Sequence, residues 1–236
     1  MKTTKDNSIK SAPLEAQQFG PTEAAYAAGI SVQRLVSWHD DSLIPEPRDL
    51  SGRGHRRVYT IELLAHLVAL RVLTERGMSL REAAKLAPTV ARSIAEMVIW
   101  THSVLTDPAT APEDDPEIIL AVINQGYYFG NTDYQLATFS KGVLDAPTGR
   151  PSWEGLLAGK SACDTEDLFA FLRTQGDGSP FVILPESLAN VLWERAIEIL
   201  DGRGTPKFRA KLQTYLASFR REKGKPRPRT KRAGCK

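Results

Sequence analysis

The sequence has few cysteines and no recognisable metal-binding spacing. Cys163 and Cys235 are the two cysteines among 236 residues, and neither stands at a ligand spacing from another cysteine or a histidine. A disulfide scaffold is not expected in a soluble chain of this size. The four histidines do not pair at helical spacing, so no structural zinc and no other cofactor is expected; they are His39, His55, His66 and His102.

Long apolar runs are also missing. No stretch approaches the roughly 20 residues needed to cross a bilayer, and residues 1–12 are polar, without the apolar centre of a signal peptide. A cytoplasmic protein without membrane contact is therefore predicted. Hydrophobic residues make up 42% of the chain, which is enough to build one large domain or two small ones.

The positive charge is concentrated at the C-terminus. Residues 220–236 hold nine Lys or Arg and one acid, Glu222, for a charge of +8, whereas the other 219 residues hold 22 basic and 27 acidic groups, for −5. This segment is either a solvated, disordered basic tail or a tail that attracts phosphate groups. The sequence leaves both interpretations open.

The first half of the chain shows two short helices separated by a glycine. After an expected flexible arm over residues 1–17, Pro21 suits the first position of a helix that ends at Gly29. Ser31 is a natural N-cap for a second helix that runs to about Asp41. Two helices and a glycine turn within about 20 residues indicate a helix-turn-helix.

A loop and further helices follow. Prolines and glycines exclude a helix over residues 42–58, and a short strand is expected over 57–59, so the loop is interpreted as a wing. A third helix is predicted from a cap at Thr60 to about Arg76, with Ile61, Leu64, Leu67, Val68 and Leu73 on its apolar face.

Two more helices are predicted before a linker. The pair Ser79 and Glu82 forms a capping box for a fourth helix, which Pro88 is expected to stop soon after Leu86. Residues 89–105 form a separate helix with an apolar stripe of Val90, Ile94, Met97, Val98 and Leu105. Residues 106–116, rich in proline and acids, are predicted to be a linker between domains.

The region 117–219 is predicted to be a small α+β domain. Residues 118–123 are an apolar run without a decisive period. Strands are expected over 126–130 and 181–184, a loop over 142–151, and helices over 165–172, 185–200 and 206–219. The helix from Pro185 is expected to bury Leu188, Val191, Leu192, Ala196 and Ile199.

Several separate motifs in the first half carry a family resemblance. They are Glu23-Ala24-Ala25, Ala28-Gly29-Ile30-Ser31, Leu35, Trp38, Leu43-Ile44-Pro45, Pro47-Arg48, Gly54-His55-Arg56-Arg57-Val58-Tyr59, Leu70, Gly77 and Ser79-Leu80-Arg81-Glu82-Ala83. In order and spacing, residues 19–87 resemble the MerR family of transcription regulators. The resemblance implies a mainly α chain: a MerR-type winged helix-turn-helix over 18–88, a helix over 89–105 that dimerises, and the α+β domain.

The resemblance also implies how such a protein binds double-stranded DNA. Two recognition helices of a homodimer enter successive major grooves, and the wings contact the flanking phosphates. Candidate groove residues are Ser31, Val32, Gln33, Arg34 and Ser37, where Gln33 suits adenine and Arg34 suits guanine or a phosphate. Candidate wing residues are Arg53, His55, Arg56, Arg57 and Tyr59. Val36 and Ser37 stand where the family usually has an Arg-Tyr pair, so one customary backbone contact is missing.

The sequence therefore predicts a sequence-specific transcriptional regulator, a homodimer on a palindromic operator, and not an enzyme. An effector or protein partner is assigned to residues 117–219 without being identified. One alternative is an architectural or recombination factor of the excisionase type. Another is an enzyme with its site in 117–219, although no nucleophile–base pair, phosphate loop or metal cluster is recognisable there. Cys163 is interpreted as an inert thiol.

Overall fold

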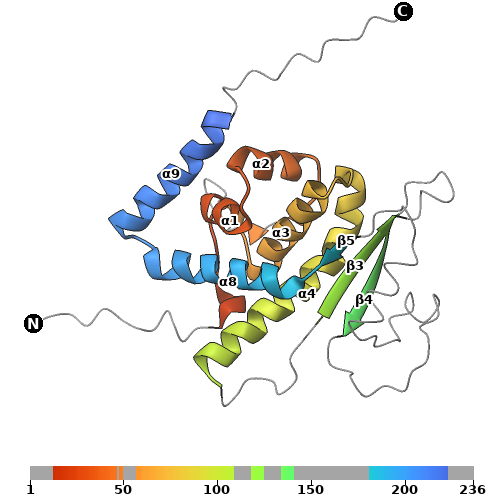
Figure 1. The fold of residues 1–236 in the computed structure, drawn as a ribbon. Helices are drawn as coiled ribbons and strands as arrows, with labels where there is room; N and C mark the ends of the chain where they lie inside the picture. Colours follow the sequence, from red (N-terminus) through yellow and green to blue (C-terminus); the bar gives the residue numbers. More distant parts are fainter. Residues whose placement is uncertain are drawn as a thin grey trace, which may run out of the picture.

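The computed structural model describes residues 13–46, 48–49, 57–108, 118–124, 134–140 and 181–222. This part of the chain is mainly helical (Figure 1), as expected. A 3-10 helix, η2 (Leu14–Ala16), precedes α1 (Pro21–Ala28), α2 (Val32–Asp40), α3 (Ile61–Glu75) and α4 (Leu80–Thr106). The C-terminal helices are α8 (Pro185–Gly202) and α9 (Pro206–Glu222). The expected strand over 126–130, loop over 142–151 and helix over 165–172 lie outside the described residues.

Two small antiparallel sheets accompany the helices. Strands β1 (Arg48–Asp49) and β2 (Arg57–Val58) pair with each other. Strands β3 (Ile118–Asn124), β4 (Tyr134–Ser140) and β5 (Phe181–Ile183) form a sheet in the order β4-β3-β5. The apolar run at 118–123 is thus a strand, and β4 was not predicted. None of the helices in the described part is long and apolar enough to span a bilayer.

The helix α4 corrects the prediction that Pro88 ends a helix. It begins at the N-cap Ser79, whose hydroxyl oxygen accepts the Glu82 backbone N–H at 3.3 Å, and it continues through Pro88 to Thr106. A proline inside a helix removes one backbone hydrogen bond and crowds the preceding turn. Here the residues on both sides of it, Ala87 and Val90, are fully buried, so packing of one continuous face outweighs the local cost.

The apolar stripe expected to form a dimer seam is buried within the chain. Val90, Ile94, Met97 and Val98 are at most 3% exposed, because α4 packs against α3 and α8 (Figure 1). Leu105, at 59% exposure, is the exception. This stripe is therefore covered by other helices of the same chain, and the dimerisation expected of residues 89–105 stays a prediction.

The C-terminal helices pack on the N-terminal ones and share their core. Helix α8 contacts α1, α3 and α4, and α9 contacts α1 (Figure 1). Leu192, Ala196 and Ile199 are completely buried in this core, as the sequence predicted, and Leu188 is partly buried against it. Ala189, which was not predicted, is also completely buried. Val191 was also expected to be buried and is 43% exposed, because it lies on the opposite side of α8. The predicted separation of 117–219 from the DNA-binding region thus does not extend to α8.

Part of the predicted N-terminal arm is folded. Leu14, in η2, is 1% exposed, and η2 contacts α3 and α4. Phe19 is fully buried and exchanges two backbone hydrogen bonds of 2.9 Å with Tyr59. An apolar side chain that fills a core site holds its segment in place, so residues 13–19 belong to the folded body.

Candidate nucleic-acid interface

The helix α2 presents one polar face to solvent. Leu35 and Trp38 are 1% and 3% exposed and point into the core, whereas Gln33, Arg34 and Ser37 are exposed. The Ser31 hydroxyl oxygen caps the helix by accepting the Arg34 backbone N–H at 3.1 Å. This amphipathic pattern places long polar side chains at the N-terminal half of α2, the half that approaches base edges in helix-turn-helix proteins.

Local contacts limit three of the candidate side chains on α2. Val32 is half-buried and packs against the core, so it offers little surface to a base. The Arg34 guanidinium carbon lies 5.7 Å from the centroid of the Trp38 ring, which is a cation–π distance. The Ser37 hydroxyl donates to Asp41 Oδ2 at 3.3 Å. Within the described part of the chain, no such contact holds the exposed Gln33 side chain, so Gln33 is the most direct candidate for groove contact.

The paired strands β1 and β2 form the stem of a wing directly after α2. Arg48 pairs with Val58 and Asp49 with Arg57, so residues 50–56 connect the two strands. Arg57 is exposed on β2. Arg53, His55 and Arg56 lie outside the described residues. The stem supports the predicted wing topology, and the contacts of its tip stay a prediction.

Tyr59 does not fit its predicted role as a wing hydroxyl. Its side chain is 1% exposed, and burial raises the pKa of its hydroxyl. Its backbone bonds to Phe19 hold the wing stem to the segment before α1. Tyr59 follows the buried Val58, bridges to Phe19 and leads into α3, so its side chain remains in the core.

Two histidines sit behind the interface. His66 on α3 is 6% exposed, and its Nε2 lies 3.4 Å from the carbonyl oxygen of Leu43, which ties the loop after α2 to α3. His39, expected on the surface, is half-buried near the end of α2. Burial, together with the positive charge of Arg57, lowers the pKa of His39. Burial lowers the pKa of His66 as well, so burial disfavours the charged form of both rings.

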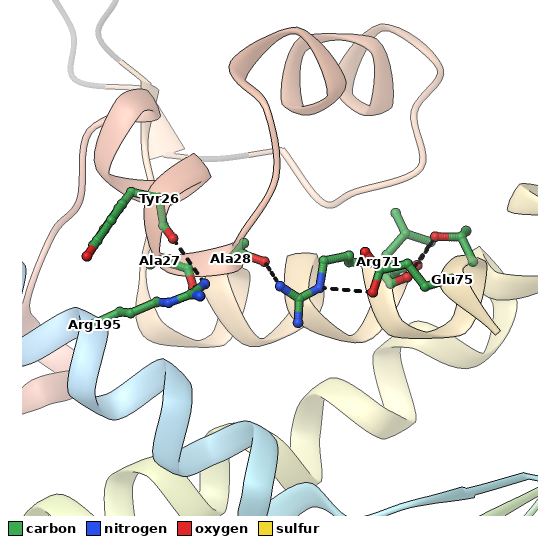
Figure 2. Close-up of polar contacts among 8 residues, drawn as sticks. Tyr26, Ala27, Ala28, Arg71, Glu75 and Arg195 are labelled. Atoms are coloured by element: carbon green, nitrogen blue, oxygen red, sulfur yellow. Dashed lines mark hydrogen bonds and ion pairs between the residues drawn. The ribbon is translucent and has the colours of Figure 1, made fainter. Parts of the chain in front are cut away.

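The carbonyl end of α1 is held by side chains from α3 and α8 (Figure 2). Arg71 of α3 donates from Nη1 to the Ala28 carbonyl at 2.8 Å, and Arg195 of α8 donates from Nη1 to the Tyr26 and Ala27 carbonyls, each at 3.3 Å. Arg71 Nε also lies 3.7 Å from Glu75 Oε2. Unpaired carbonyls at a helix C-terminus carry partial negative charge, so two cations are favourable there.

Helix α9 adds a hydroxyl to the same end of α1. The Tyr215 hydroxyl lies 3.1 Å from the Ala25 carbonyl oxygen and 3.0 Å from that of Ile30. Sequence reasoning missed Arg195 and Tyr215, because no local pattern marks contacts across 169 to 190 positions. The nearest sequence signal was Gly29, which predicts a tight helix end but does not identify the residues that contact it.

A cavity of about 500 Å³ opens between α3 and α4. Its lining is mostly apolar and includes Leu63, Pro88 and Ile99. Pro45, which precedes the wing, also lines it. The described part of the chain contains no group of three His, Cys, Asp or Glu placed to hold a metal ion.

A helix, a tight glycine turn, a second helix with an exposed polar face, and a paired-strand wing together define a winged helix-turn-helix, a class of DNA-binding module. Comparison with known families agrees: residues 21–89 match the model described as MerR HTH family regulatory protein. The chain therefore carries a MerR-type helix-turn-helix region, typical of DNA-binding transcriptional regulators. The match covers less than a third of the chain, and no curated protein matches it.

Proposed function

We propose that the protein is a sequence-specific transcriptional regulator that binds a palindromic operator as a homodimer. The observation that carries the proposal is the exposed polar face of α2, where Gln33 and Arg34 follow the N-cap Ser31. An amide side chain can form two hydrogen bonds to adenine, and a guanidinium can form two to guanine. The matched family and the wing stem β1–β2 support the same function.

The wing would contact the phosphate backbone beside the major groove. Arg53, His55, Arg56 and Arg57 place several donors within five positions of the sequence, and Arg57 is exposed at the stem. Backbone contacts of this kind position the protein without reading bases. The basic segment 220–236 would add attraction to phosphate at low salt if it approaches the duplex.

Dimerisation would use a surface other than the buried stripe of α4. The expectation of a homodimer rests on the family resemblance and on the symmetry of palindromic operators. Residues 117–219 would supply an effector or partner contact, except where α8 is already engaged with α1, α3 and α4. Light scattering on the purified protein, free and bound to DNA, measures the subunit number directly.

The first test selects DNA from a random duplex library and footprints the preferred site. We expect an inverted repeat; direct repeats would instead favour the recombination factor. Gln33→Ala should lower affinity for the selected site by about 5- to 100-fold, because a two-bond base contact contributes about 1–3 kcal/mol. Asp40→Ala, an exposed change at the other end of α2, is the control. If Gln33→Ala binds like wild type, the assignment of α2 as the reading helix is wrong.

The wing assignment has its own prediction. Replacing Arg56 and Arg57 together with alanine should weaken binding to every duplex and reduce the slope of log K against log salt by about one for each lost phosphate contact. Arg76→Ala, which removes an exposed arginine at the end of α3, is the control for charge alone. Unchanged affinity together with an unchanged salt slope would overturn the wing contact.

A further inference from the structure

The turn between α1 and α2 contains three residues, Gly29 to Ser31, so it sets the direction in which α2 leaves α1. Gly29 adopts φ 72° and ψ 31°, the left-handed conformation, and Ile30 leads directly to the N-cap Ser31. The backbone N–H groups of Gly29 and Ile30 donate to the Tyr26 and Ala25 carbonyls at 3.1 and 3.0 Å. This pattern is a Schellman motif. A change in the backbone conformation of this turn would therefore change the direction of α2.

Side chains from distant helices lie directly against this turn. A Cβ atom placed on Gly29 would lie 2.1 Å from Arg71 Nη1 and 2.9 Å from Arg195 Nη1. Both guanidinium groups thus occupy the space that any other residue would need. They donate to the carbonyls of Tyr26, Ala27 and Ala28, so the last turn of α1 is fixed from outside as well as by its own backbone.

Tyr215 joins the two sides of the turn. Its hydroxyl has one hydrogen and lies within bonding distance of the Ala25 carbonyl on α1 and the Ile30 carbonyl next to α2. Burial raises the pKa of this hydroxyl to about 12, against the lowering effect of Arg195 and Arg71. The group therefore stays protonated at neutral pH and remains a donor.

The helices that carry Arg195 and Tyr215 are themselves anchored to α1. Arg203, after α8, forms two hydrogen bonds to the Glu23 carboxylate at 3.0 and 3.1 Å. The Tyr26 hydroxyl donates to Glu198 Oε2 at 2.6 Å, and Lys211 of α9 pairs with the same carboxylate. The Tyr26 and Tyr215 rings pack edge to face at 5.1 Å. Arg195 and Tyr215 therefore lie on helices whose positions relative to α1 are fixed by these contacts.

We propose that Arg195 and Tyr215 are positioning residues for the recognition helix, which hold the α1–α2 turn and so determine how well α2 distinguishes its operator from other DNA. The inference rests on the proposed function. Base contacts need donor and acceptor within about 3 Å, whereas attraction to phosphates tolerates displacement. A loosened turn therefore costs specific binding more than non-specific binding.

The test variant is Tyr215→Phe, which keeps the ring and removes the hydroxyl. Its matched control is Ser218→Ala on the same helix, whose hydroxyl, among the described residues, donates only to the Tyr215 carbonyl within α9. Affinity is measured for the selected operator and for a scrambled duplex at the same salt. We expect the operator affinity of Tyr215→Phe to fall about 3- to 10-fold, as for loss of one hydrogen bond, with unchanged affinity for the scrambled duplex. Arg195→Lys should likewise lower the affinity for the operator relative to the affinity for the scrambled duplex.

A second measurement does not depend on DNA. Amide hydrogen exchange at residues 30–34 of the free protein should accelerate about 3- to 10-fold in Tyr215→Phe and not in Ser218→Ala. Equal loss of binding to both duplexes, or unchanged exchange at 30–34, would overturn the positioning role. If wild-type protein fails to distinguish any operator, the proposed function fails, while the exchange result still decides whether Tyr215 holds the turn.

Discussion

Replacing Leu192 with alanine is expected to lower the free energy of unfolding by about 2–5 kcal/mol, the range for removing a fully buried leucine side chain. Leu192 is completely buried on α8, where that helix meets the N-terminal helices. Since α8 shares one core with α1, α3 and α4, the loss should also destabilise the helix-turn-helix. Urea denaturation followed by circular dichroism measures the change.

The neighbouring residue supplies the control. Val191 is 43% exposed, so Val191→Ala should change stability by about 0.5 kcal/mol or less. Amide hydrogen exchange then shows which elements lose stability. Leu192→Ala should reduce protection against exchange in α1 and α3 together with α8. Two separate unfolding transitions, with α1 protected as in wild type, would show that α8 and the DNA-binding region fold independently.

Gly29→Ala is expected to have the second large effect. A left-handed residue with a Cβ costs about 1–2 kcal/mol, and the new methyl group would displace Arg71 and Arg195 from carbonyls at about 1 kcal/mol for each hydrogen bond. With one hydrogen bond from Arg71 and two from Arg195, we expect a total loss of about 4–5 kcal/mol in the free energy of unfolding, measured by urea denaturation, and weaker operator binding in a direct titration.

Gly77→Ala separates the two causes of that loss. Gly77 also has a positive φ, 94°, but within the described part of the chain nothing lies within 4 Å of a Cβ placed there. It should show the conformational cost without the displaced arginines, and thus about a third of the effect of Gly29→Ala. Equal losses in the two variants would mean that the arginines move at no cost, and that their contacts with the turn contribute little to stability.

The sequence predicted those elements that depend on neighbouring residues. Pro21, Gly29 and Ser31 mark the start and end of α1 and the cap of α2 by local chemistry, and the structure confirms all three. Leu35 and Trp38 were assigned to the core by their spacing, and they are buried. These features need no knowledge of the rest of the chain.

The errors arise where distant packing decides. Pro88 is a strong local stop signal, yet α4 continues because α3 and α8 cover the face on both sides of it. The stripe from Val90 to Val98 was correctly recognised as apolar, but its partner is α8 of the same chain rather than a second subunit. Tyr59 resembled an exposed wing residue until its backbone pairing with Phe19 placed it in the core.

The contacts that hold the recognition turn also fix when it can form during synthesis. Arg195 and Tyr215 follow their partners on α1 by 169 and 190 residues. At a ribosomal rate of about 5–20 residues per second, they are made roughly 10–40 s after α1. The turn therefore gains these contacts only after α8 and α9 have been synthesised. On the proposed function, a prematurely terminated chain that contains every groove and wing candidate, but ends before residue 185, would compete poorly for an operator with the chain that carries α8 and α9.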